Sequence, residues 1–210
     1  MKYKLAAFDM DGTLLEGYGC WVKIHRYFDT LHIGNSNLRE YDEGRMDYEE
    51  FMKRDINAWL ARRKVHVSEI EKILSEFAVV ENAKDVIRGL REANCTTAII
   101  SSGIDILAEK VASYLGIEHV RANKLVTDCR GYLTGEGIMI VDPGRKDDVL
   151  KGLCAELHIK PNESMAVGDS KYDRSFLRAS GLGIAYRGDE ELRKSADVTV
   201  SRLTEILEHL

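Results

Sequence analysis

The feature that most constrains this chain is a pair of acidic residues at the end of a short apolar run near its start. Residues 5 to 13 read Leu-Ala-Ala-Phe-Asp-Met-Asp-Gly-Thr. An apolar run of this length without a helical period predicts a buried parallel strand, so Asp9 and Asp11 would stand at its carboxyl end, where open α/β sheets bind ligands. Two carboxylates this close repel each other, and we expect a cation such as Mg2+ to keep them ionised.

Two other interpretations of this segment are a simple turn and a calcium loop. Asp-Gly often helps a chain leave a strand, but a turn leaves a doubly charged, half-buried strand end unexplained. Asp-x-Asp also opens the EF-hand pattern, whose sixth position would be Leu14 instead of Gly and whose twelfth would be Cys20 instead of Glu. Metal-held carboxylates, one of which can act as a nucleophile, are therefore the preferred interpretation.

Composition limits the partners of the chain. Its 210 residues, 44% hydrophobic and 31% charged, suit one α/β domain with a smaller insertion. A net charge of −5 argues against broad nucleic-acid binding. No apolar run approaches membrane-spanning length, and the first four residues run straight into the first strand, so we expect a cytoplasmic protein without a membrane partner. The sequence indicates no particular oligomeric state. The cysteines form no C-x-x-C pair and suggest neither a zinc site nor a disulfide framework; they are Cys20, Cys95, Cys129 and Cys154.

From residue 83 onward, helical and strand patterns alternate as in a doubly wound parallel sheet. The expected strands are 96–100, 117–121, 164–167, 182–185 and 198–200. The expected helices are 83–92, 104–115, 145–157, 173–179 and 203–210. Glycines between short β-branched runs in 125–140 suggest a hairpin or a β-extension away from the main sheet.

Residues 14–82 have a different, charged and helix-period pattern with no convincing strand. Amphipathic helices are expected at 21–31, 47–62 and 68–77. Because this insertion follows the acidic strand end directly, we expect it to cover that end as a helical cap. The predicted division is a catalytic core of residues 1–13 and 83–210 and a cap of residues 14–82.

Two further strand ends carry groups suited to an anion. Ser101-Ser102-Gly103 combines a hydroxyl with backbone N–H groups at a helix start, which can bind an anion, although for Ser102 an ordinary helix entry is an equal alternative. Lys146 opens a helix, where a cation needs an anionic partner. It would neutralise both Asp9 and a bound phosphate, whereas the default for any single lysine is a solvated surface position.

The segment Gly168-Asp169-Ser170-Lys171-Tyr172-Asp173 follows another apolar strand. Asp169 would complete the metal site. For Asp173, a helix cap or a residue that orients a metal ligand is favoured over direct ligation.

Together these four segments resemble, in order, chemistry and strand-end placement, the motifs of the haloacid dehalogenase superfamily of phosphohydrolases. The resemblance spans nearly the whole chain. Among the branches, the chain is most similar to the phosphoserine phosphatase type, which has a helical cap after the first motif, a turn like that at 101–105, a stretch like 122–125 and a hairpin before the lysine.

The resemblance implies a Mg2+-dependent phosphomonoester hydrolase acting through an aspartyl-phosphate, with phosphoserine as the first candidate substrate. Asp9 resembles the nucleophile, and Asp11 resembles the acid that protonates the leaving oxygen and then activates water. Asp9, the backbone carbonyl of Asp11, and Asp169 resemble the Mg2+ ligands. The expected phosphate contacts are Ser101, Ser102, Gly103 and Lys146. In-line phosphoryl transfer is mostly positioning and charge neutralisation, which these residue types supply.

The cap departs from the branch at the two positions that bind the amino acid part of phosphoserine. The glutamate position aligns with Tyr18, two residues from Glu16, and the arginine position aligns with Asp55, next to Arg54. Glu16 and Arg54 are therefore the nominated contacts for the ammonium and the carboxylate.

Other small phosphomonoesters, such as a sugar phosphate or phosphoglycolate, remain alternatives because a fold does not fix a leaving group. A receiver-like signalling domain is a less favoured alternative, because such a domain lacks a cap and carries its phosphoacceptor on the third strand instead of the first. The intact set of acidic, hydroxyl and lysine residues argues against a non-catalytic phosphate-binding protein.

Overall fold

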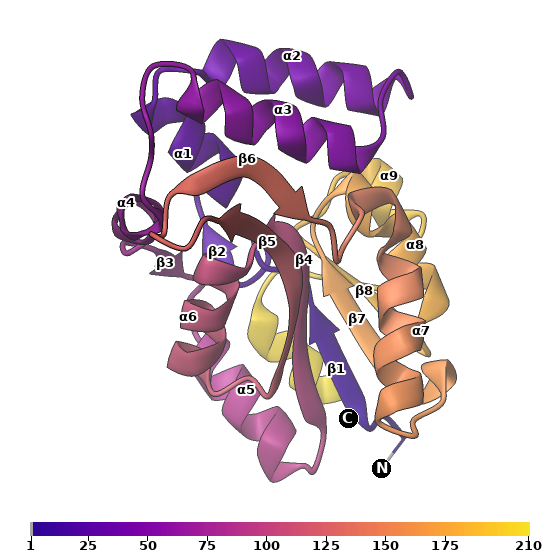
Figure 1. Cartoon of the computed structure of the whole chain (residues 1–210). Helices are drawn as coiled ribbons and strands as arrows, with labels where there is room; N and C mark the ends of the chain where they lie inside the picture. Colours follow the sequence, from indigo (N-terminus) through magenta and orange to yellow (C-terminus); the bar gives the residue numbers. More distant parts are fainter. Residues whose placement is uncertain (1) are drawn as a thin grey trace.

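The computed structural model describes residues 2–210 and contains a seven-stranded sheet covered by helices on both faces, with a smaller cap above one end of the strands (Figure 1). The strand order is β6-β5-β4-β1-β7-β8-β9, and every neighbouring pair is parallel except β5 with β6. The predicted α/β fold, a doubly wound parallel sheet with an inserted helical cap, is confirmed. The strands of the sheet are β1 Leu5–Phe8, β4 Thr96–Ile104, β5 His119–Thr127, β6 Leu133–Ile138, β7 Ser164–Gly168, β8 Leu182–Tyr186 and β9 Val198–Val200.

The helices of the core lie where the alternating pattern placed them, with small shifts. They are α5 Ala83–Glu92, α6 Asp105–Leu115, α7 Lys146–Glu156, α8 Arg174–Ala179 and α9 Glu190–Arg193. The core also contains short 3-10 segments, which are η1 Pro143–Arg145, η2 Pro161–Glu163, η3 Lys171–Asp173 and η4 Leu203–His209. The last expected helix, 203–210, is thus a 3-10 segment, and α9 was not expected. Within residues 2–210, no helix is both long and apolar enough to cross a bilayer.

The central position of β1 explains its unbroken apolar sequence. It pairs with β4 on one side and β7 on the other, so its backbone hydrogen bonds are satisfied within the sheet. Its alternate residues enter different cores: Phe8 packs with α5 and α6 residues, whereas Leu5 packs with α7 and α8 residues. Both faces are covered, which is why the strand shows no polar alternation.

The cap differs from the sequence prediction in both its helices and its strands. Its elements are β2 Leu15–Glu16, α1 Cys20–Tyr27, α2 Leu31–Asp42, α3 Tyr48–Leu60, α4 Val67–Ile73 and β3 Ala78–Val79. The expected helix 21–31 ends at Tyr27, and α2 was missed because only Gly34 and Asn37 of its residues are buried, which leaves little apolar pattern. The expectation of no strand was also wrong, since β2 and β3 pair antiparallel where the chain enters and leaves the cap.

The predicted hairpin is present, but it continues the main sheet. The expected strand 117–121 begins at His119 and runs on to Thr127, and β6 returns antiparallel beside it. Figure 1 shows this hairpin curving up beneath the cap helices α2 and α3. The hairpin therefore connects the edge of the sheet with the cap.

Candidate active site

The end of β1 brings Asp9 next to the loop that follows β7. Asp9 is 6% exposed, and its N–H donates to Val167 O at 2.9 Å. The chain then turns at Gly12, whose φ is +94°. A Cβ built on Gly12 would lie 2.2 Å from Asp169 Oδ2, so only glycine allows this approach. Thr13 Oγ1 donates to Asp169 Oδ1 at 2.9 Å, so the two predicted acidic segments are in contact.

Lys146 is buried between two carboxylates. Its Nζ lies 2.6 Å from Asp9 Oδ1 and 2.7 Å from Asp173 Oδ1, and the side chain is 2% exposed. Burial lowers the pKa of Lys146, but the charges of Asp173 and Asp9 outweigh that effect and hold it above its ordinary value. The interpretation of Lys146 as a solvated surface residue is therefore wrong.

Asp173 is fully buried and uses both carboxylate oxygens inside the protein. Oδ1 accepts from Lys146, and Oδ2 accepts from the N–H groups of Asp169 and Ser170 at 3.1 and 3.0 Å and from Ser170 Oγ at 3.2 Å. The expected helix 173–179 begins instead at Arg174, and Asp173 makes no side-chain cap bond to it. Its contacts fix the loop that carries Asp169.

Asp9, Asp169 and Asp173 form an acidic cluster in which one oxygen from each lies within 4.8 Å of the others. Burial is the main cause that raises the pKa of Asp9 well above its ordinary value, and burial followed by the charge of Asp173 raises that of Asp169 to about 6. Lys146 supplies one positive charge against three carboxyl groups. Carboxylate oxygens with this excess of negative charge suit a hard cation such as Mg2+.

The side chain of Asp11 lies apart from this cluster, toward the cap. Its Oδ2 accepts from the N–H of Cys20, the first residue of α1, at 3.1 Å. Burial raises the pKa of Asp11, although the hydrogen bond from Cys20 opposes the shift. A carboxyl group with a raised pKa is suited to giving and taking a proton.

Ser101, Ser102 and Gly103 lie within β4, because this strand continues to Ile104 beyond the expected end at residue 100. Ser101 is buried, and its Oγ accepts from Gly103 N–H at 3.0 Å, which leaves its O–H available as a donor. The N-cap of α6 is Ile104 without a side-chain bond, so Ser102 does not cap that helix.

The backbone carbonyl of Ser102 accepts several hydrogen bonds that the sequence did not predict. It accepts from Trp21 Nε1 at 3.1 Å, Tyr48 OH at 2.9 Å and Asn123 Nδ2 at 2.9 Å. The first two donors come from α1 and α3 of the cap, and Asn123 comes from β5. The cap is thereby hydrogen-bonded to the segment 101–103, which contains the predicted phosphate contacts.

Asn123 also fixes the segment that leads to Lys146. It is fully buried, its Nδ2 donates to Val141 O at 3.0 Å, and its Oδ1 accepts from the N–H groups of Ile140 and Val141 at 2.7 and 2.8 Å. The stretch 122–125 contributed to the family resemblance, but the contacts of this side chain depend on tertiary structure.

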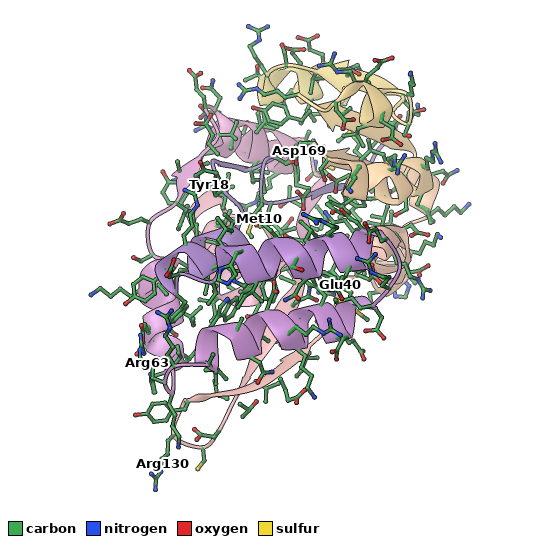
Figure 2. All side chains as sticks on the ribbon, turned by 90° about the horizontal axis from the view of Figure 1, so that it is seen from above. Met10, Tyr18, Glu40, Arg63, Arg130 and Asp169 are labelled. Atoms are coloured by element: carbon green, nitrogen blue, oxygen red, sulfur yellow. The ribbon has the colours of Figure 1, made fainter. Side chains whose placement is uncertain are left out.

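The structure does not bring Glu16 and Arg54 together. Arg54 is exposed and pairs with Glu50 at 2.7 Å and Glu40 at 3.0 Å, whereas the nearest basic partner of Glu16 is Arg187 at 3.9 Å. Seen from above, Glu40 lies at the opposite end of the cap helices from Tyr18, which is two residues from Glu16 in the chain (Figure 2).

Tyr18 and Asp55, which align with the glutamate and arginine positions of the branch, also have other partners. The Tyr18 ring is exposed with the Arg26 guanidinium 3.6 Å from its centroid. Asp55 is buried within the cap, where Oδ2 lies 3.0 Å from His25 Nε2 and Oδ1 accepts from Asn37 at 2.6 Å.

Comparison with known proteins agrees with this arrangement of strand-end acids, lysine and cap. A family model described as haloacid dehalogenase-like hydrolase matches residues 3–181, and the chain belongs to this family. Within it, the relatives place the chain in the branch that resembles phosphoserine phosphatases. It is 27% identical to the phosphoserine phosphatase of Methanocaldococcus jannaschii, with 100% of this chain and 98% of the relative covered. It is 32% identical to that of Idiomarina loihiensis, with 97% and 91% covered.

Other relatives are longer, and solved structures share the fold. The chain spans 57% of the phosphoserine phosphatase of Archaeoglobus fulgidus, to which it is 29% identical. A solved structure described as a phospho-aspartyl intermediate analogue of phosphoserine phosphatase has a TM-score of 0.83 and 26% identity, with 100% of both chains covered. A substrate-bound phosphoserine phosphatase has a TM-score of 0.83 and 25% identity, with 100% of this chain and 99% of the other covered.

Proposed function

We propose that this chain hydrolyses small phosphomonoesters with the help of Mg2+ and forms a phosphorylated Asp9 on the way. The observation that carries the proposal is the buried contact of Lys146 with Asp9 and Asp173, 2.6 and 2.7 Å away. A phosphate beside Asp9 would meet the ammonium group at once, which is the charge neutralisation that phosphoryl transfer requires.

The residues divide the reaction between them. The Asp9 carboxylate attacks phosphorus, and the bond to the leaving oxygen breaks. Asp11, on the cap side of the site, gives its proton to that oxygen. It then takes a proton from the water that cleaves the aspartyl-phosphate, so both products leave with their protons balanced. The O–H of Ser101 and the ammonium group of Lys146 bind the phosphate oxygens.

Asp9, Asp169 and the backbone carbonyl of Asp11 are the proposed Mg2+ ligands, with Asp173 as the residue that orients Asp169. When bound, Mg2+ supplies positive charge to the phosphate and keeps the carboxylates ionised. Supporting this assignment, Asp173 has both oxygens occupied by protein donors, whereas among residues 2–210 the Asp169 side chain accepts only from Thr13.

Phosphoserine is the first candidate substrate because several relatives are named phosphoserine phosphatase. The residues at positions 18 and 55 favour a second candidate, a phosphomonoester of an uncharged alcohol such as a sugar. Tyr18 is not an acid that could meet an ammonium, and Asp55 is not a cation that could meet a carboxylate, so the two positions offer no matched pair for a zwitterion. The boundaries of the cap and the cytoplasmic location stay predictions.

Phosphate release tests the proposal. Purified protein should hydrolyse p-nitrophenyl phosphate with Mg2+ and lose that activity in excess EDTA. Activity that persists unchanged in EDTA would contradict the mechanism. Comparing kcat/KM for phosphoserine with that for phosphoglycolate and sugar phosphates then identifies the leaving group.

A further inference from the structure

Two of the edges along which the cap meets the core differ in character. On one edge, α3 lies against the β5–β6 hairpin with close backbone approach. A Cβ on Gly137 would lie 2.6 Å from Met52 Cε, and one on Gly135 would lie 2.7 Å from Asn57 Oδ1. Asn57 Nδ2 donates to Gly135 O at 2.9 Å. Side chains packed this closely transmit strain between the two elements.

The turn of the hairpin adds backbone bonds to the same edge. The N–H of Val67 donates to Gly131 O at 2.9 Å, and the N–H of Leu133 donates to Val65 O at 2.9 Å. Residues 65 to 67 lead into α4 of the cap. The hairpin edge is therefore held by close packing and by backbone hydrogen bonds.

The other edge is held by polar side chains at the C-terminal end of α2. Asp42 Oδ2 lies 2.8 Å from Lys171 Nζ, and Asp42 Oδ1 accepts from Tyr172 OH at 2.7 Å. Tyr41 OH donates to Asp142 Oδ1 at 2.8 Å. In Figure 1 the turn from α2 to α3 lies on the side of α8 and α9, away from α4 and α6.

A cleft of about 710 Å³ runs along this polar edge, between cap and core. Its walls include Asp42 and Met46 from the cap, and Lys171, Tyr172 and Arg174 from the core. The side chains of Lys171 and Asp42 are 43% and 30% exposed, so water reaches their ion pair. Exposed pairs of this type are weak and break readily.

The core partners of this edge belong to the loops of the proposed active site. Lys171 and Tyr172 lie between Asp169 and Asp173, in a loop that Asp173 ties together through its bonds to Asp169 and Ser170. Asp142 accepts from Gly144 N–H at 2.7 Å at the start of the turn that leads to Lys146. A displacement of Asp42 would therefore disturb contacts of the loop that carries Asp169, the proposed metal ligand.

We propose that Asp42 is a positioning residue: through its contacts with Lys171 and Tyr172 it holds the 169–173 loop in the arrangement that the reaction requires. This inference rests on the proposed function, because it assigns Asp169 of that loop to the reacting site.

Hydrogen exchange without metal or substrate tests the proposal independently of activity. Asp42→Ala should speed amide exchange in a peptide spanning residues 168–174, because two of the contacts holding that loop are lost. The matched control is Glu40→Ala, on the same helix, whose partner Arg54 is also in the cap. Equal exchange in the two variants would overturn the proposal whether or not the protein proves to be a phosphatase.

Kinetics separate positioning from a purely structural or substrate-binding role. Asp42→Ala should lower kcat/KM by about two- to fivefold, the range expected for exposed ion pairs, and to a similar extent for p-nitrophenyl phosphate and a metabolite phosphate. In a double-mutant cycle with Lys171→Met, the second substitution should add little to the first. Additive losses, or a loss confined to one substrate, would overturn the assignment.

Asp42→Asn guards against misfolding as an explanation. It removes the charge from the pair with Lys171 but retains an acceptor for Tyr172. If Asp42→Ala melts early, Asp42→Asn should still show the faster exchange of residues 168–174 with a near-normal Tm. Exchange equal to that of the unsubstituted protein would count against the proposal.

Discussion

The ammonium group of Lys146 lies 2.6 Å from the carboxylate of Asp9, and both side chains are withdrawn from solvent. One oxygen of the predicted nucleophile is therefore paired with a cation before any substrate arrives. The same lysine holds Asp173, so a single charge links the residue that would attack phosphorus to the loop of the predicted metal ligand.

Asp9→Asn should abolish turnover, because an aspartyl-phosphate cannot form without that carboxylate. We expect kcat to fall by roughly a thousandfold or more, in line with losses on removing other catalytic nucleophiles. Phosphate release from p-nitrophenyl phosphate measures the change. Near-normal activity of Asp9→Asn together with an inactive Asp11→Asn would reverse the roles assigned to the pair.

Asp173→Asn should destabilise the protein by about 3–5 kcal/mol, as expected when one partner of a buried charge pair is removed. The amide has one accepting oxygen, so it cannot serve both Lys146 and the N–H groups of Asp169 and Ser170. Urea unfolding measures the free energy. Asp9→Asn, which leaves Lys146 paired with Asp173, is the matched comparison, and an equal loss in both would contradict this account.

Stabilisation by Mg2+ should grow with pH. The pKa of Asp169 is raised from 3.8 to about 6, mainly by burial, so the folded metal-free protein binds a proton there that the unfolded chain has lost. Its metal-free stability consequently falls as pH rises between these values. A cation needs the ionised form, so Mg2+ should raise Tm little at pH 5 and clearly at pH 7.5. The expected gain is about 2.7 kcal/mol at a hundredfold excess over Kd. In Asp169→Asn the dependence on pH should weaken, and the part that remains is due to Asp9, whose pKa burial also raises. An equal gain at both pH values in the unsubstituted protein would exclude Asp169 as a ligand.

Glu16→Gln and Arg54→Met should change KM for phosphoserine by less than about twofold, because exposed ion pairs with other partners contribute little. KM for p-nitrophenyl phosphate, which has neither an ammonium nor a carboxylate, is the reference. A rise confined to phosphoserine would restore these two residues as contacts for the amino acid.

Sequence was informative where a local pattern determines structure. The apolar run before Asp9 and the apolar strand before Asp169 predicted their positions, because a buried parallel strand leaves few other arrangements for an acid at its end. The helix α2 escaped prediction because its surface is mostly exposed.

The contacts of Asn123 and Asp42 also escaped prediction, but for a different reason. Each depends on segments distant in the sequence meeting in the fold, such as Asp42 with Lys171 and Tyr172. The periodicity of apolar residues and the position of a residue at a strand end do not predict contacts between distant segments.

The central place of β1 has a consequence for how the protein is made. Leu5 pairs with Thr96 and with Ser164, so the strand that leads to Asp9 leaves the ribosome long before either neighbour. Until both arrive, its backbone groups and apolar side chains lack their native partners and are open to association with other chains. A chain that ends before β7 would carry Asp9 but lack Asp169, Asp173 and one neighbour of β1. Such a truncated chain should therefore be insoluble instead of partly active.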